Sequence, residues 1–354
     1  MRFKLIGLIA VLAFVSENAI LAKNVDHLPA LSTMFSANPT DQLMKAVKNN
    51  NVSEVKSLIK QNININYKDV SGDTALIKAS TSGYKNIAEA LIKSKKADVN
   101  IKNKTGKTAL TVAVMNDHKD IVKLLLKNKA DANIKDDRGW TPLMYAANST
   151  KSNHKEIVKL LLDNKADPNV QNENKKTALV IAVERGDIEV VKKLLNSSLL
   201  KKVLKKTRAN IDIPDNKNWT ALMVSVAQEN IDLTKLLLKN KANPDLKNGE
   251  GQTALMIAAS KGRSDIVTLL TKKKADVRAT DNKKRTVLMY AASHERIDQK
   301  TIELLLKKGS DIHAKDVFGQ TALDYAQNAG RVAIVNLLIK KGASVKGKVS
   351  ISVQ

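Results

Sequence analysis

Thr141-Pro142-Leu143-Met144-Tyr145-Ala146-Ala147 decides the fold, because altered copies of this stretch recur along the chain. A typical copy has a leucine two residues after its threonine and a small residue three places further on. Successive copies begin 34, 34, 33, 36, 43, 33, 33 and 35 residues apart, and a period near 33 indicates a stack of like units. The copies begin at Thr40 (a weaker one), Thr74, Thr108, Thr141, Thr177, Thr220, Thr253, Thr286 and Thr321.

Each copy predicts two short helices. The opening threonine favours an N-cap, because its hydroxyl can accept an orphan backbone N–H, and Pro142 suits the first helical position. Apolar residues at i, i+3 and i+4 predict a second helix, as in residues 121–126, and residues 130–139 predict an extended connection with a tight turn. One unit cannot bury its apolar face alone, so we expect an elongated solenoid. Glycines that permit a left-handed turn end the first helix at Gly83, Gly186, Gly262 and Gly330.

This pattern resembles the ankyrin repeat family. The closest fit is Asp136-Asp137-Arg138-Gly139-Trp140-Thr141-Pro142-Leu143, followed by Ile157-Val158-Lys159-Leu160-Leu161 and by Ala166-Asp167. The resemblance covers residues 40–345 and implies an all-α repeat solenoid, in which stacked helix-turn-helix repeats are joined by β-turn fingers. Such a resemblance speaks to fold and says little about function.

The segments before and after the repeats lack the repeat pattern and are interpreted separately. Residues 1–22 resemble a secretory signal, with Arg2 and Lys4 before an apolar run over residues 5–15 and a cleavage point at Ala22. An uncleaved membrane anchor is the alternative for this segment. We expect a linker over residues 23–39, nine ankyrin repeats over residues 40–345, and a C-terminal tail over residues 346–354. The leader predicts an exported protein, which is secreted, periplasmic or held at a surface.

Departures from the ankyrin pattern make further predictions. The histidine that usually follows the leucine is missing, and we expect Met144, Met223, Met256 and Met289 to pack in its place. Glycine before the Ala-Asp pair is also mostly lost, which costs about 1 kcal/mol wherever the backbone still needs a positive φ. Extra residues lie around 149–152, around 196–202 and near 295–296. The residues that replace the glycine are Lys96, Lys129, Lys165, Arg208, Lys241 and Lys274.

No stretch of the sequence carries a catalytic pattern. Thr105-Gly106-Lys107-Thr108 resembles the end of a phosphate loop, but Ile101 occupies the place of its first glycine. The chain has no cysteine, and its five histidines have no metal-ligand spacing. We therefore expect no enzymatic activity, no catalytic residues, no metal, no cofactor and no small-molecule substrate. Aspartates recur as turn and cap residues at Asp98, Asp131, Asp167 and Asp276.

The net charge of +25 leaves a second function open. Clusters such as Lys201-Lys202 and Lys272-Lys273-Lys274 could attract nucleic acid or an anionic membrane. Many lysines, however, fall in the last turn of a second helix, such as Lys127, Lys239, Lys272, Lys307 and Lys340, where they complement the helix dipole and keep the solenoid soluble.

The resemblance implies a concave binding face, formed by the tips of the turns and by one position of each first helix. Both tryptophans and most aromatic residues outside the leader fall on this face, and such residues together with arginine dominate binding hot spots. Arg138, Trp140 and Tyr145 form the best local cluster. The alternative is that these rings only cover neighbouring backbone. The predicted protein-binding residues are Arg138, Trp140, Tyr145, Trp219, Arg285, Tyr290, Phe318 and Tyr325.

Together these features predict a non-catalytic, monomeric scaffold that binds a partner protein through the concave face. The resemblance and the leader also imply a bacterial, secreted effector.

Overall fold

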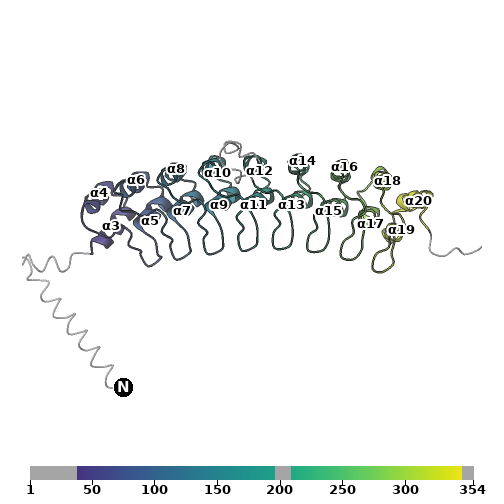
Figure 1. Ribbon diagram of the computed structural model, residues 1–354, viewed down its shortest axis with the longest axis horizontal. Coiled ribbons are helices and arrows are strands. Elements are labelled where there is room, and N and C mark those ends of the chain that lie inside the picture. The colour runs from purple at the N-terminus through teal and green to yellow at the C-terminus, as the bar shows by residue number, and fades with distance from the viewer. Residues whose placement is uncertain (1–37, 196–208, 345–354) are drawn as a thin grey trace, which may run out of the picture.

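The computed structural model describes residues 38–195 and 209–344, which form an all-α repeat solenoid, as predicted. Figure 1 shows two rows of helices, with the connecting loops hanging from one side of the array. The first helices, nearest these loops, are α3 (Pro39–Lys48), α5 (Ala75–Ser82), α7 (Ala109–Met115), α9 (Pro142–Asn148), α11 (Ala178–Glu184), α13 (Ala221–Ala227), α15 (Ala254–Ser260), α17 (Val287–Ser293) and α19 (Ala322–Asn328). The second helices are α4 (Val52–Lys60), α6 (Lys85–Lys93), α8 (Lys119–Lys127), α10 (His154–Asp163), α12 (Ile188–Leu195), α14 (Ile231–Lys239), α16 (Ser264–Lys272), α18 (Gln299–Lys307) and α20 (Val332–Lys340).

Threonine caps begin most of the first helices. The hydroxyl accepts the backbone N–H of the third helical residue, for example from Ile77 to Thr74 at 3.3 Å. The prediction is wrong for the first repeat, where Asn38 is the N-cap and Thr40 lies inside the helix. Asn38 accepts the backbone N–H of Thr40, and Pro39 takes the first helical position, where its missing N–H costs nothing.

Left-handed residues end the helices, often without glycine. Gly83 and Gly262 have φ values of 78° and 68° after the first helices. After the second helices, lysine takes the left-handed conformation in five repeats. The expectation for Lys96 is wrong, because Lys95 is the residue with positive φ, and Arg208 lies outside the described residues. The left-handed lysines are Lys95, Lys129, Lys165, Lys241 and Lys274.

The core is a row of thin aliphatic layers between neighbouring repeats. Met144, Met223, Met256 and Met289 are each 1% exposed, so methionine fills the place of the missing histidine as predicted. Beside the second helices, Asp and Asn side chains link successive repeats; Asp131 N–H, for example, donates to Asn100 Oδ1 at 2.9 Å. Asp98, Asp131, Asp167 and Asp276 accept turn N–H groups, which agrees with their predicted role.

Two of the expected insertions lie between helices of one repeat. Residues 149–153 separate α9 from α10, and residues 294–298 separate α17 from α18. The third insertion lies outside the described residues, as do the predicted signal, nearly all of the predicted linker, and the tail. In residues 38–195 and 209–344, no helix is long and apolar enough to span a bilayer.

Candidate binding face

The loops that enter the first helices, which we call fingers, share one turn built by a single side chain. In each finger an Asp or Asn oxygen accepts the backbone N–H of the residues two and four places later. Asp136 Oδ1 accepts from Arg138 at 3.0 Å and from Trp140 at 2.8 Å. The same residue recurs as Asp69, Asn103, Asp136, Asn172, Asp215, Asn248, Asp281 and Asp316.

Backbone hydrogen bonds join each finger to the next. Asp137 N–H donates to Thr105 O at 3.3 Å, and Asn282 N–H donates to Glu250 O at 3.0 Å. These bonds and the Asx turns fix the fingers side by side. The fingers and the first helices therefore form one continuous surface, which we call the binding face (Figure 1).

Four side chains meet at the finger of the fourth repeat, and we call them the Asp136 cluster: Asp136, Arg138, Trp140 and Tyr145. The Tyr145 hydroxyl donates to Asp136 Oδ2 at 2.5 Å and accepts from Arg138 Nη2 at 3.1 Å. The Trp140 and Tyr145 ring centroids are 5.0 Å apart, and the Arg138 guanidinium lies 5.9 Å from the Trp140 ring centroid. Burial and the Asp136 hydrogen bond raise the pKa of Tyr145.

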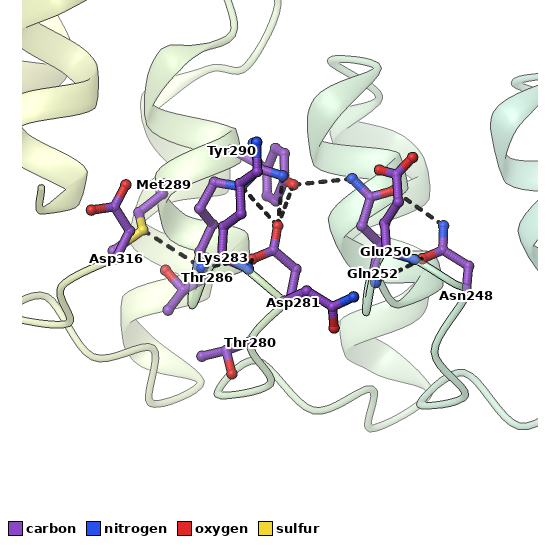
Figure 2. A network of polar contacts seen from close by, with 12 residues as sticks. Asn248, Glu250, Gln252, Thr280, Asp281, Lys283, Thr286, Met289, Tyr290 and Asp316 are labelled. Carbon is purple, nitrogen blue, oxygen red and sulfur yellow. Dashed lines mark hydrogen bonds and ion pairs between the residues drawn. The ribbon is translucent and has the colours of Figure 1, made fainter. Parts of the chain in front are cut away.

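A second set, the Asp281 cluster, comprises Gln252, Asp281 and Tyr290, which Figure 2 labels, together with Arg285. The Tyr290 hydroxyl donates to Asp281 Oδ2 at 2.7 Å and accepts from Gln252 Nε2 at 3.0 Å. Arg285 Nη2 lies 2.7 Å from the same carboxylate oxygen, and its guanidinium lies 4.8 Å from the Tyr290 ring centroid. The cluster joins two repeats, because Gln252 belongs to the finger before Asp281.

Electrostatics in the Asp281 cluster follow from its burial. Burial raises the pKa of Tyr290 to about 12, and the adjacent Asp281 carboxylate adds to the effect, although the Gln252 hydrogen bond opposes it. Burial alone would raise the pKa of Asp281, but hydrogen bonds from Tyr290 and Arg285 hold it below its ordinary value. The cluster is therefore a neutral tyrosine held between a carboxylate and an amide at neutral pH.

The remaining predicted residues are placed differently. Tyr325 donates to Asp316 Oδ2 at 2.9 Å in the last repeat, while Phe318 is 74% exposed at the tip of the same finger. Trp219 is half-buried, and its backbone N–H donates to Asp215 Oδ1 at 2.8 Å. The structure thus brings Arg138, Trp140 and Tyr145 together and pairs Arg285 with Tyr290. Phe318 and Tyr325 share the last repeat, and Trp219 stands in a repeat of its own.

Sequence reasoning missed the aspartates that anchor the tyrosines. Asp136, Asp281 and Asp316 each lie nine residues before the tyrosine they bind. That spacing is constant because both residues keep fixed places in the repeat, so it could have revealed the pairs. The same helix position holds Val112, Ile181 and Ile257, which are 7%, 3% and 3% exposed and belong to the core.

Titratable side chains also meet away from the fingers. No three His, Asp or Glu side chains within residues 38–195 and 209–344 are grouped to hold a metal ion. His154 is 9% exposed, and its Nε2 lies 2.7 Å from Asp187 Oδ2, which joins α10 to the next repeat. Burial alone would raise the pKa of Asp187, but the His154 hydrogen bond holds it below its ordinary value. This pair is explained by packing between repeats.

The comparison with known families agrees with this geometry. A family model described as ankyrin repeats (3 copies) matches residues 18–103, 95–172, 149–248, 196–281, 222–316 and 279–348. No curated protein matches the chain. These overlapping matches extend over most of the sequence, and they agree with the helix pairs and fingers of the structure. The chain therefore belongs to the ankyrin repeat family.

Proposed function

We propose that this chain binds a partner protein through its binding face and has no catalytic role. Ankyrin repeats are in general protein–protein interaction modules. The observation that supports the proposal most directly is the fixed arrangement of aromatic and arginine side chains in the Asp136 and Asp281 clusters. Tryptophan, tyrosine and arginine carry most of the energy in protein interfaces.

The rigidity of the face favours binding. Arg138 and Tyr145 are already held by hydrogen bonds in the free protein, so they lose little side-chain entropy when a partner docks. Each rotamer-rich side chain that is ordered only on binding costs about 0.5–1.5 kcal/mol. A face that is ordered in advance avoids much of this cost.

The N-terminal segment that resembles a secretory signal supports a proposal about where the protein acts. A positive start followed by a short apolar run in residues 1–15 supports export, and we propose that the protein acts as a monomeric, secreted bacterial effector. An uncleaved leader would instead tether the same binding face to a membrane.

The test is capture of a partner by residues 23–354, which contain every described residue. Changing Trp140 and Trp219 together to alanine removes two half-buried rings from the face, whereas Tyr84→Ala removes a ring at the start of the outer helix α6. We expect a discrete protein that survives nuclease treatment, is lost with the double variant, and is retained with Tyr84→Ala. Circular dichroism checks that both variants keep their helices.

The excess of basic residues supports one alternative, an electrostatic binder of nucleic acid or anionic membrane. The chain has 60 Lys and Arg against 35 Asp and Glu. Such binding weakens linearly in log affinity against log salt, because bound counterions are released. Capture that disappears with nuclease or moderate salt, and that ignores the tryptophan substitutions, would replace the main proposal with this one.

A further inference from the structure

The fingers follow a pairing rule between their Asx residue and the first-helix residue nine places later. Where the finger carries aspartate, the second carboxylate oxygen meets a donor in four cases: Asp69 with Lys78, Asp136 with Tyr145, Asp281 with Tyr290, and Asp316 with Tyr325. Where the finger carries asparagine, the partner position is aliphatic: Asn103 with Val112, Asn172 with Ile181, and Asn248 with Ile257. The rule is physical, since a carboxylate that is wholly or partly buried needs a donor and an amide is uncharged.

Asp215 is the exception to this rule. It is 7% exposed, and its Oδ1 accepts the backbone N–H of Lys217 and Trp219, each at 2.8 Å. The residue nine places later is Val224, which has no donor. Among the described residues, no hydrogen bond or ion pair reaches Asp215 Oδ2. Asp215 thus keeps an acceptor oxygen that the described residues leave without a donor, on a residue that retains 7% of its surface exposed.

The surroundings of Asp215 differ from the two clusters in a second respect. Arg138 lies over Trp140 beside Asp136, and Arg285 lies over Tyr290 while it pairs with Asp281. The finger of Asp215 likewise has a carboxylate and a half-buried ring, Trp219, but no arginine. Lys217 stands where Arg138 stands in its own finger, yet within the described residues no hydrogen bond or ion pair is formed by its side chain.

We propose that Asp215 and Trp219 form a subsite for an arginine side chain of the partner protein. The guanidinium would donate to Asp215 Oδ2, as Arg285 donates to Asp281 Oδ2, and would lie over the Trp219 indole, as Arg138 lies over Trp140. A guanidinium fits better than an ammonium, because its planar fork pairs with carboxylates and stacks on rings. This inference rests on the proposed protein-binding function and adds one chemical requirement for the partner.

The experiment is a titration of residues 23–354 with N-acetylarginine amide, followed by the indole N–H signals in a nitrogen–proton NMR spectrum. The two tryptophans give two such signals, and Trp219→Phe assigns them. We expect a saturable shift of the Trp219 signal with little change at Trp140. N-acetylcitrulline amide, which has the same shape without the charge, is expected to bind roughly tenfold more weakly.

Two variants separate the subsite from general attraction by other acidic groups. Asp215→Asn keeps the finger turn but removes the charge, and Val224→Tyr supplies the internal donor that Tyr145 and Tyr290 supply elsewhere. Asp215→Asn is expected to abolish the Trp219 shift. Val224→Tyr is expected only to weaken binding of the probe, because Asp281 Oδ2 accepts from Tyr290 and Arg285 together. Asp136→Asn is the matched control, because Asp136 already has an internal partner, and it is expected to leave the shift unchanged.

Equal shifts at both tryptophans, or a Trp219 shift that persists in Asp215→Asn, would overturn the subsite. Absence of any shift in the parent protein would do the same. None of these results bears on partner capture through the Asp136 cluster, so failure of the subsite and failure of the proposed function can be told apart. A Lys217→Ala variant that binds the probe more tightly would support the subsite, because it removes a cation from the same finger.

Discussion

The finger of Asp136 and the finger of Asn172 have the same backbone turn, but they differ in the first-helix residue that lies nine places later, which is polar in one and aliphatic in the other. Asp136 Oδ1 accepts from Arg138 and Trp140, and Asn172 Oδ1 accepts from Asn174 and Lys176, both at 3.0 Å. The second carboxylate oxygen of Asp136 binds Tyr145, whereas the residue in the same place after Asn172 is the buried Ile181. In both fingers, therefore, Oδ1 of the Asx residue forms the turn. The other side-chain atom, Oδ2 of Asp or Nδ2 of Asn, makes contacts that differ from one repeat to the next.

The largest expected effect comes from removing an Asx side chain, because this removes the acceptor that forms the finger turn. Asp281→Ala removes the acceptor of two backbone N–H groups and of Tyr290 and Arg285, and we expect unfolding in urea to become easier by about 3 kcal/mol. Asn248→Ala removes the same backbone acceptor without a buried tyrosine partner, so its loss should be smaller. Equal losses in the two fingers would show that the second oxygen contributes nothing.

Replacing the asparagine of one finger by aspartate tests the rule that pairs the Asx residue with the first-helix residue nine places later. Asn248→Asp removes the donor that Asn248 Nδ2 offers to Gln252 Oε1 at 3.2 Å and leaves a carboxylate opposite the aliphatic Ile257, and we expect a loss of about 1–2 kcal/mol in urea unfolding at neutral pH. Adding Ile257→Tyr supplies the donor and should recover most of that loss. The rule would be contradicted if the second substitution made the protein less stable still.

Alkaline pH is expected to have a smaller effect, and only on the fingers in which an aspartate binds a tyrosine. The pKa of Tyr290 and of Tyr325 is raised to about 12, chiefly by burial, from an ordinary value of 10.0. Because the folded state keeps these protons longer, their contribution to stability is complete below pH 10.0 and is lost as pH rises toward about 12. Tyr290→Phe should remove a component near pH 12 from the ultraviolet titration. A titration identical to the parent's would contradict this placement of Tyr290.

The smallest effect concerns the turn that follows the second helix, where a lysine takes the left-handed conformation. Lys129 and Lys165 have φ values of 65° and 66°. Changing Lys129 to glycine relieves the left-handed strain and should stabilise the protein by about 0.5–1 kcal/mol, measured by urea unfolding. Lys127→Gly, in the last turn of α8, is the control and should destabilise.

The repeat architecture could be predicted from the sequence, but the contacts between side chains on the binding face were not predicted. The threonine period, the glycine turns and the buried methionines could be predicted, because they follow from local geometry repeated many times. Thr40 was misassigned as a cap because Asn38-Pro39 is a stronger start signal two residues earlier. The Asp136–Tyr145 pair was missed because it depends on how a finger folds back onto its helix; the signal for it in the sequence is the nine-residue spacing that recurs in Asp281–Tyr290 and Asp316–Tyr325.

The central claim is that a partner protein docks on the binding face. Hydrogen exchange of the captured complex, compared with the free protein, tests it most directly. We expect slower exchange at residues 136–145, 215–224 and 281–290, and unchanged exchange in the outer helices α8, α10 and α14. Protection confined to the outer helices, with the fingers unaffected, would contradict the account.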